Sequence, residues 1–144
     1  MKIRNSAKAI LIHENKLLVI KHKDQDGIFY LLPGGGQIPG ETLPETVKRE
    51  LLEEAGVEVE VSKVILLREC FIDQDFHRVE FMFTCGLKRE NSKYLKQDRE
   101  QIGVEWLSIQ ELKSFPLYPV SLREAILNYY NGRSNLPIYA GEMP

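Results

Sequence analysis

Long apolar runs and a basic segment are both missing from this chain of 144 residues. The longest apolar stretches, such as Val64 to Leu67, fall far short of the roughly 20 residues that span a bilayer, so we expect no membrane partner. No leader-like charged and then apolar segment is recognisable, which predicts a cytoplasmic location. The formal net charge is −2 and the Lys and Arg residues are scattered, which argues against a nucleic-acid partner.

Cysteine is scarce, because the chain has only Cys70 and Cys85. Both lie in apolar segments without a CxxC or Cys/His spacing, so we expect buried thiols and neither a disulfide nor a metal-ligand pair. The chain also lacks repeats and low-complexity segments. Its length and 43% hydrophobic content predict one domain over residues 1–132, followed by an irregular C-terminal tail over residues 133–144.

Strand-like segments occupy much of the chain. Ala9–His13 and Lys16–His22 flank Glu14-Asn15, which is typical of a hairpin turn, and Ile28–Leu32 is a short third strand. Three further strands are expected at 57–70, 78–87 and 104–108, with a polar turn at 72–77. Strands in mixed order around two or three helices predict a layered α/β (α+β) domain with a mixed β-sheet.

Helix signals mark three segments. Thr42 and Glu45 form a capping-box pattern and Gly56 suits a C-terminal cap, which predicts a helix over Leu43–Ala55. Ser108 is expected to cap a short helix that reaches Lys113. A final helix is expected over residues 121–130, ended by Asn131 and Gly132.

Three glutamates gather on one side of the Leu43–Ala55 helix. At about 100° per residue, Glu50, Glu53 and Glu54 fall within about 100° of one another at the edge of the apolar arc. A solvated acidic face is the ordinary explanation of such a pattern. However, carboxylates three and four positions apart repel, and acidic residues near a helix C-terminus oppose the helix dipole. A bound Mg²⁺ or Mn²⁺ would offset both effects, because these ions prefer oxygen ligands.

The segment LLPGGGQIPGE precedes this helix at residues 31–41. It is not a P-loop, since no Lys-Ser/Thr pair follows the glycines, and it lacks the dinucleotide-binding spacing. Glycines would let the backbone pass close to whatever the carboxylates hold, and a backbone carbonyl there could add an oxygen ligand.

Taken together, the loop and the helix resemble a known motif. Gly35, Glu41 and the run Arg49-Glu50-Leu51-Leu52-Glu53-Glu54-Ala55-Gly56-Val57 match the Nudix box, G-x5-E-x7-R-E-U-x-E-E-x-G-U with U apolar, at every defined position. At about 7% usage for each fixed residue, a chance match in this chain is below about one in a million. The chain is therefore identified from its sequence as similar to MutT-like members of the Nudix hydrolase family.

The resemblance implies an αβα sandwich with a mixed sheet and a hydrolase that depends on Mg²⁺ or Mn²⁺. Its expected substrate is a nucleoside diphosphate linked to another moiety, and a homodimer is a reasonable expectation. Two alternatives stay open: a housecleaning hydrolase of oxidised nucleoside triphosphates, and a nucleotide-sensing module without turnover. The substrate markers of other Nudix groups are absent outside the box, so the substrate stays undefined.

The same resemblance assigns roles to individual residues. Glu50, Glu53, Glu54 and the Gly34 carbonyl are expected to be metal ligands, and Glu50 also to orient or deprotonate the attacking water. Arg49 and Glu41 are expected to form an ion pair that holds the loop against the helix. Glu100 stands six positions before Trp106, as a further catalytic acid does in MutT-like members, although a solvated loop charge is an equal explanation.

Residues that would recognise the rest of the substrate are weakly indicated. An aromatic side chain can stack on a nucleobase, but core packing is the simpler explanation for each aromatic residue in strand-like segments. The candidates for stacking are Phe29, Tyr30, Phe81 and Phe83. The candidates for contacts with phosphate or ribose, each more simply a surface residue, are Lys21, His22, Lys23, Arg68 and Arg78.

Overall fold

A computed structural model of the chain describes residues 1–71, 74–90, 101–133 and 138–143. Two α-helices and one 3-10 helix accompany the strands in this part of the chain: α1 (Leu43–Ala55), η2 (Ile109–Ser114) and α2 (Ser121–Tyr130). The strands are β1 (Lys2–His13), β2 (Lys16–Asp24), β3 (Gly27–Leu31), β4 (Gly34–Gly36), β5 (Val57–Cys70), β6 (Phe76–Glu90), β7 (Gln101–Ser108) and β8 (Tyr139–Glu142).

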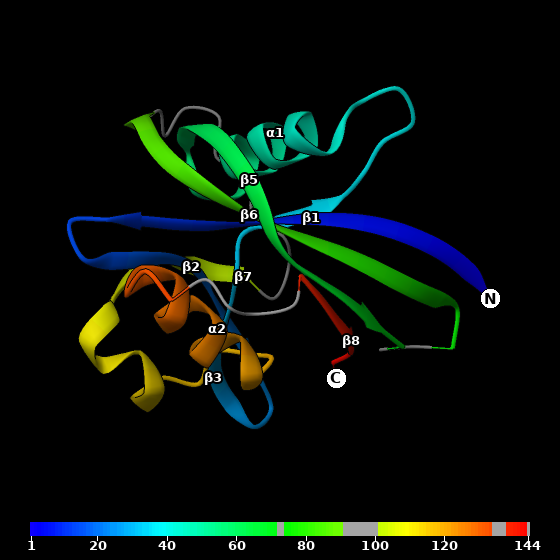
Figure 1. Cartoon of the computed structure of the whole chain (residues 1–144). Helices are drawn as coiled ribbons and strands as arrows, with labels where there is room; N and C mark the ends of the chain where they lie inside the picture. The colour runs from blue at the N-terminus through cyan, green and yellow to red at the C-terminus, as the bar shows by residue number, and fades with distance from the viewer. Residues whose placement is uncertain (72–73, 91–100, 134–137, 144) are drawn as a thin grey trace.

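The strands form one mixed sheet in the order β3-β2-β1-β6-β5-β8, with β4 paired to β1 and β7 paired to β2. β1 runs parallel to β6, and most other pairs are antiparallel. Figure 1 shows α1 on one side of the strands and α2 with η2 on the other. This arrangement confirms the expected αβα sandwich with a mixed sheet.

Different parts of β1 pair with different neighbouring strands. Its first half pairs with β4, from Ser6 opposite Gly36 to Lys8 opposite Gly34, whereas its end pairs with β2 at Ile12 and His13. The glycine segment that we expected to be a loop is therefore partly a short strand. Its pairing with β1 fixes the position of this glycine strand beside α1.

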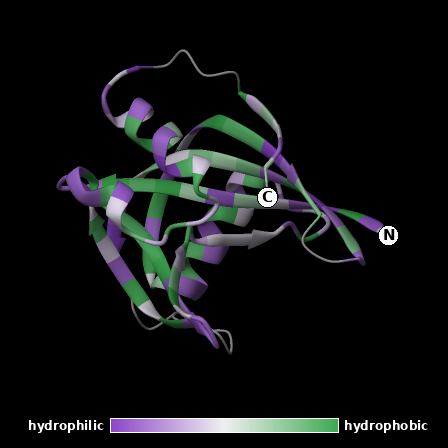
Figure 2. Ribbon diagram, turned by 90° about the horizontal axis from the view of Figure 1, so that it is seen from below, coloured by the Kyte–Doolittle hydropathy of each residue, from purple (hydrophilic) through white to green (hydrophobic). Residues whose placement is uncertain are grey.

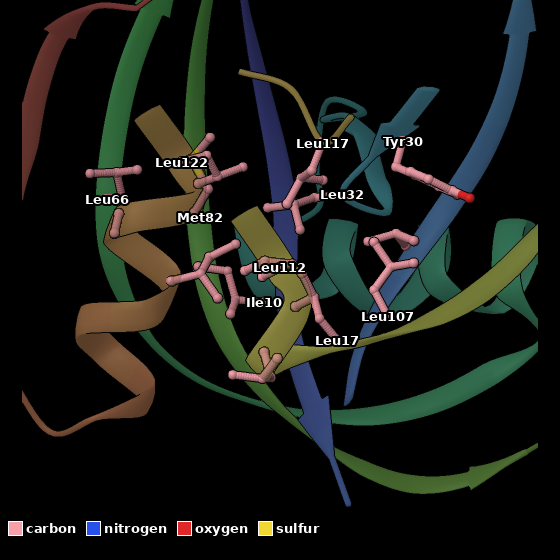
Figure 3. Close-up of a cluster of buried hydrophobic side chains, with 14 residues drawn as sticks. Ile10, Leu17, Tyr30, Leu32, Leu66, Met82, Leu107, Leu112, Leu117 and Leu122 are labelled. Atoms are coloured by element: carbon pink, nitrogen blue, oxygen red, sulfur yellow. The ribbon is translucent and has the colours of Figure 1, made fainter. Parts of the chain in front are cut away.

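Two apolar layers flank the sheet because side chains alternate along each strand. Along β1, Ala7, Ala9 and Leu11 face α1 and pack against Val47 and Leu51. The opposite layer faces α2 and η2; its labelled members in Figure 3 are Ile10, Leu17, Tyr30, Leu32, Leu66, Met82, Leu107, Leu112, Leu117 and Leu122. Figure 2 shows hydrophilic and hydrophobic positions alternating along the ribbon of the strands.

Local sequence signals account for several element ends. Glu14 and Asn15 both have positive φ, as a two-residue hairpin turn with the twist of its strands requires. Thr42 accepts a hydrogen bond from the Glu45 backbone while the Glu45 side chain accepts one from Thr42, so the capping box is present. Gly56 ends α1 in the left-handed conformation at φ 65°.

Two local expectations differ from the structure, and a third concerns a turn that the structure describes only in part. Ser108 makes no side-chain cap, and the segment after it is a 3-10 helix that ends at Ser114. β6 begins at Phe76 and continues to Glu90, well beyond the strand expected at 78–87. The polar turn expected at 72–77 includes residues 72–73, which lie outside the described residues.

The C-terminal segment is not irregular throughout, contrary to expectation. Tyr139–Glu142 form β8, which pairs in parallel with β5. The Tyr139 hydroxyl donates a hydrogen bond to Glu69, and the Met143 N–H donates to the Glu69 carbonyl at 3.0 Å. The edge of β5 offers backbone groups that need partners, and a returning segment of modest β propensity satisfies them.

No helix in the described part of the chain is long and apolar enough to cross a membrane.

Both cysteines are free and buried, at 0% exposure for Cys70 and 9% for Cys85. Burial raises the pKa of both thiols, that of Cys85 to about 12, because the thiolate loses its hydration. We predict that neither thiol reacts with Ellman's reagent at pH 8 in the native protein, and that both react at once after denaturation. Rapid modification of either thiol without denaturant would contradict this burial.

Candidate functional site

The glycine strand lies directly against the acidic side of α1. A side chain at Gly35 would bring its Cβ within 2.6 Å of the Glu50 carboxylate, and one at Gly34 within 2.1 Å of the Ala7 carbonyl oxygen. Gly34 also has φ +145°, which disfavours any L side chain. The glycines therefore permit a close approach of backbone to the helix carboxylates, as the sequence suggested.

Arg49 joins the loop to the helix through one guanidinium group. Its Nε and Nη2 donate to the two Glu41 carboxylate oxygens at 3.1 and 2.8 Å, a bidentate pair. Nη2 also donates to the Gly36 carbonyl at 3.0 Å. The remaining nitrogen, Nη1, lies 2.9 Å from Glu50 Oε1 and 3.5 Å from Glu53 Oε2. The expected ion pair between Arg49 and Glu41 is present, and it extends to two of the three helix glutamates.

Glu41 is held by more than Arg49. Its Oε1 accepts hydrogen bonds from the Ile38 N–H at 3.0 Å and from the Thr46 hydroxyl at 2.8 Å. The hydrogen bonds from the Arg49 guanidinium, and then those from the other donors, lower the pKa of Glu41 to about 2. The Glu41 carboxylate in turn raises the pKa of Arg49. Glu41 is consequently ionised over the whole physiological pH range, and the loop stays tied to α1.

Glu54 occupies a different environment from its two neighbours. It is buried at 9% exposure, in agreement with its place between apolar positions on the helix. Oε1 accepts a hydrogen bond from the Gly34 N–H at 2.8 Å, and Oε2 accepts one from Gln101 Nε2 at 2.5 Å. Burial raises the pKa of Glu54 to about 7, against the opposing effect of the nearby Lys8 ammonium group.

Gln101 was missed by the sequence reasoning, which selected its neighbour Glu100. The only sequence signal was the position of Gln101 at the start of the strand that leads to Trp106. Glu100 lies outside the described residues, so its catalytic role stays a prediction. The contact shows that the start of β7 lies beside the C-terminal part of α1.

The structure brings together some of the expected metal ligands. Glu50 and Glu53 converge on the Arg49 Nη1, whereas Glu54 turns toward Gly34 and Gln101. Among the described residues, no group of three or more His, Cys, Asp or Glu side chains is arranged to hold a metal ion. The ligand roles of the three glutamates and of the Gly34 carbonyl therefore stay predictions.

Several candidates for substrate recognition are structural. Tyr30 and Phe83 are buried in the two apolar layers, as the simpler explanation required. Arg68 is not a surface residue, because it is 7% exposed and donates from Nε to Glu80 at 2.8 Å. Phe29 is half-buried and stacks on His22 with ring centroids 5.2 Å apart.

Comparison with protein families identifies the class to which this fold and glutamate-bearing helix belong. The model of the NUDIX domain matches residues 2–128, which is most of the chain. The chain therefore belongs to the NUDIX family, and the resemblance read from the box is confirmed.

Individual relatives are distant. The chain is 25% identical over 134 residues to the human nucleoside diphosphate-linked moiety X motif 6, covering 90% of this chain and 42% of that protein. It is 28% identical over 130 residues to a putative 8-oxo-dGTP diphosphatase from Bacillus subtilis, covering 90% of this chain and 80% of that protein. The chain spans half or less of the length of the motif 6 relatives that it matches.

Solved structures show the same fold. A NUDIX hydrolase from Nitrosomonas europaea superposes with a TM-score of 0.77 at 20% identity, covering 92% of both chains. The solution structure of the E. coli ORF135 protein superposes with a TM-score of 0.69 at 24% identity, covering 94% of this chain and 96% of that one.

The Glu41 contacts predict a pH-dependent contribution to stability. Glu41→Gln keeps the shape but removes the charge, so we expect a lower melting temperature than the parent's at pH 7. Because the folded-state pKa of Glu41 is depressed to about 2, its stabilisation is present above the ordinary value of 4.5 and is lost as the pH falls toward 2. The difference in melting temperature should therefore shrink between pH 4.5 and 2.

Thermal unfolding followed by circular dichroism measures this difference. Glu60→Gln is the matched control, because Glu60 is an exposed carboxylate on β5. If the difference in melting temperature between the parent and Glu41→Gln stays constant from pH 7 to pH 2, the charged contact is not its source.

Proposed function

We propose that the protein is a divalent-metal-dependent hydrolase that cleaves the phosphoanhydride bond of a nucleoside diphosphate linked to another moiety. The observation that carries this proposal is the complete Nudix box, with Glu50 and Glu53 presented beside the glycine strand by Arg49. Membership of the NUDIX family and the names of the relatives support a hydrolase of phosphoanhydride bonds.

The donor set fits a hard cation. Mg²⁺ is usually held by one or two carboxylates, with waters and substrate phosphates completing an octahedral shell. Glu50 and Glu53 supply two carboxylates that lie near the same guanidinium nitrogen, and the bare Gly35 backbone leaves no side chain over Glu50. The Gly34 carbonyl and Glu54 are the further ligands that the box predicts. Bound there, Mg²⁺ or Mn²⁺ would neutralise the diphosphate and lower the pKa of a coordinated water.

The residues of this chain would hold and orient the reactants. Arg49 restrains the Glu50 and Glu53 carboxylates from rotating freely, since both are within reach of one nitrogen. Glu50 is the proposed general base, as the box implies, and its carboxylate lies directly against the Gly35 backbone. Such a base typically contributes 10² to 10⁴-fold to the rate.

A second substrate class has one observation in its favour. The relative from Bacillus subtilis is named as a putative 8-oxo-dGTP diphosphatase, and the chain covers 80% of it. Hydrolysis of an oxidised nucleoside triphosphate is therefore the alternative activity. It would use the same carboxylates but release pyrophosphate and a nucleoside monophosphate.

A substrate panel scored by product identity tests both activities. We predict Mg²⁺- or Mn²⁺-dependent turnover of nucleoside diphosphate derivatives, abolished by EDTA and restored by excess metal. Turnover that EDTA leaves unchanged would refute the metal-dependent mechanism. Nucleotide binding without turnover of any member of the panel would favour the nucleotide-sensing alternative.

Glu53→Gln tests the carboxylates without disturbing the core, because Glu53 is only partly buried on α1. We predict that kcat falls by about 10²-fold or more, since even the outer partners of metal ligands are worth 10 to 100-fold. The melting temperature in EDTA should change little. Glu60→Gln is the control for loss of a carboxylate. Unchanged turnover by Glu53→Gln would contradict the proposed role of Glu53 as a metal ligand.

A further inference from the structure

The turn that brings Glu41 to Arg49 is exposed to solvent. Residues 38–40 are all exposed, and Gly40 among them has a positive φ of 96°. Figure 1 draws this segment in cyan, as a loop that leaves the sheet after β4 and returns at the start of α1. Exposed loops with few buried contacts are the parts of a fold that open most easily. The contact between Glu41 and Arg49 therefore depends on how the ends of this turn are fixed to the sheet.

Gln37 is located at the junction between β4 and this turn. Its N–H donates to the Asn5 carbonyl at 3.0 Å, which continues the pairing of β4 with β1 by one residue. Its side chain connects two segments, because Nε2 donates to the Glu41 carbonyl at 2.8 Å and Oε1 accepts from Asn5 Nδ2 at 3.2 Å. One carboxamide thus joins β1 to the end of the turn.

Glu41 is held through its main chain as well as through its carboxylate. Its N–H donates to the Ile38 carbonyl at 3.1 Å, which closes the turn on itself, and its carbonyl accepts from Gln37. Arg49 also reaches the sheet side of the loop, at the Gly36 carbonyl, but that contact is made by the guanidinium group that Glu41 has to orient. Gln37 holds Glu41 to β1 independently of Arg49.

These contacts form a continuous chain of hydrogen bonds from β1 to α1, through Asn5, Gln37, Glu41, Arg49 and Glu50. The bidentate pair with Glu41 sets the plane of the Arg49 guanidinium group. A shift of the Glu41 main chain would turn Arg49 Nη1 away from Glu50, which lies 2.9 Å from it. Misplacement of a reacting group by about 1 Å can cost 10²-fold in rate, so a small shift is sufficient to matter.

We propose that Gln37 is a positioning residue for Glu50 and Glu53, which acts by fixing Glu41, and through it Arg49, relative to β1. This inference rests on the proposed function, because it concerns the same carboxylates. It predicts that loss of the Gln37 carboxamide lowers kcat and leaves KM little changed, since the orientation of these carboxylates matters most in the transition state. Gln37 is only partly buried, so its replacement should not disturb the core.

The first experiment measures the position of Arg49 without catalysis. The arginine Nε–Hε resonances of the ¹⁵N-labelled protein are followed by NMR in EDTA, and the Arg49 signal is identified by its loss in Arg49→Lys. Gln37→Met keeps the length of the side chain and removes its hydrogen-bonding groups. The Arg49 signal should shift in this variant, and its Nε–H should exchange faster with water.

Gln110→Met is the matched control, because Gln110 is an exposed glutamine on η2, and it should give the Arg49 signal of the parent. An Arg49 signal in Gln37→Met that equals the parent's overturns the proposal. This readout needs no turnover, so an inactive protein would refute the proposed function and leave the measurement of Gln37 intact.

The second experiment separates positioning from general stabilisation, with Mg²⁺ and a substrate that the parent hydrolyses. We expect kcat of Gln37→Met to fall by about 10-fold, the lower end of the range for outer partners of metal ligands, and Gln110→Met to resemble the parent. In a Glu41→Gln background, Gln37→Met should lower kcat little further, because residues that act through one chain of contacts are not additive. An unchanged kcat, or the same fold-loss in both backgrounds, overturns the proposal.

Asn5→Ala tests the other end of the link. Asn5 is exposed, so its replacement should leave the fold intact, and the hydrogen bond from Gln37 to the Glu41 carbonyl can still form. We expect a smaller loss of kcat than in Gln37→Met, and no further loss when the two changes are combined. If the two losses instead multiply in the double variant, the side chains act separately and the link from β1 to Glu41 is refuted.

Discussion

Arg49 connects the glycine strand, the loop before α1 and two glutamates of α1 through five nitrogen–oxygen contacts on one guanidinium group. The planar fork of arginine can serve a carboxylate bidentately while its remaining nitrogen reaches a second group, which lysine cannot do. Without this residue, Glu50 and Glu53 would repel each other on the same side of the helix. The proposed chemistry depends on this contact, because a metal site requires carboxylates that are already close together.

Two groups of charged side chains lie on opposite faces of the sheet at β1. On one side, α1 carries Glu50 and Glu53 beside the glycine strand, while the opposite face of the sheet carries Lys8 and Arg78 in a small cavity. Alternation along β1 turns Ala7 and Ala9 toward α1 and Lys8 toward the opposite face, although the Lys8 ammonium group still acts to lower the pKa of Glu54.

The buried Glu54 is positioned by different elements from the more exposed Glu50 and Glu53. Glu54 is positioned by Gly34 and Gln101, which belong to β4 and β7, whereas Glu50 and Glu53 are positioned by a residue of their own helix. Movement of β7 relative to α1 would therefore affect Glu54 before the other two glutamates. Gln101 is consequently a positioning residue for Glu54.

Six of the strands, the helical segments, the capping box of α1, the hairpin at Glu14-Asn15 and the family could be read from the sequence, because each depends on residues close together in the chain. The box also predicted the contact between Glu41 and Arg49, which are eight positions apart. Only the tertiary structure decided that the glycines form β4, that residues 139–142 add β8, that Gln101 reaches Glu54, and that Arg68 is buried on Glu80 while Arg78 Nε has no described partner. These contacts join segments distant in sequence, so their partners were set by how the sheet and its layers pack, which no local pattern encodes.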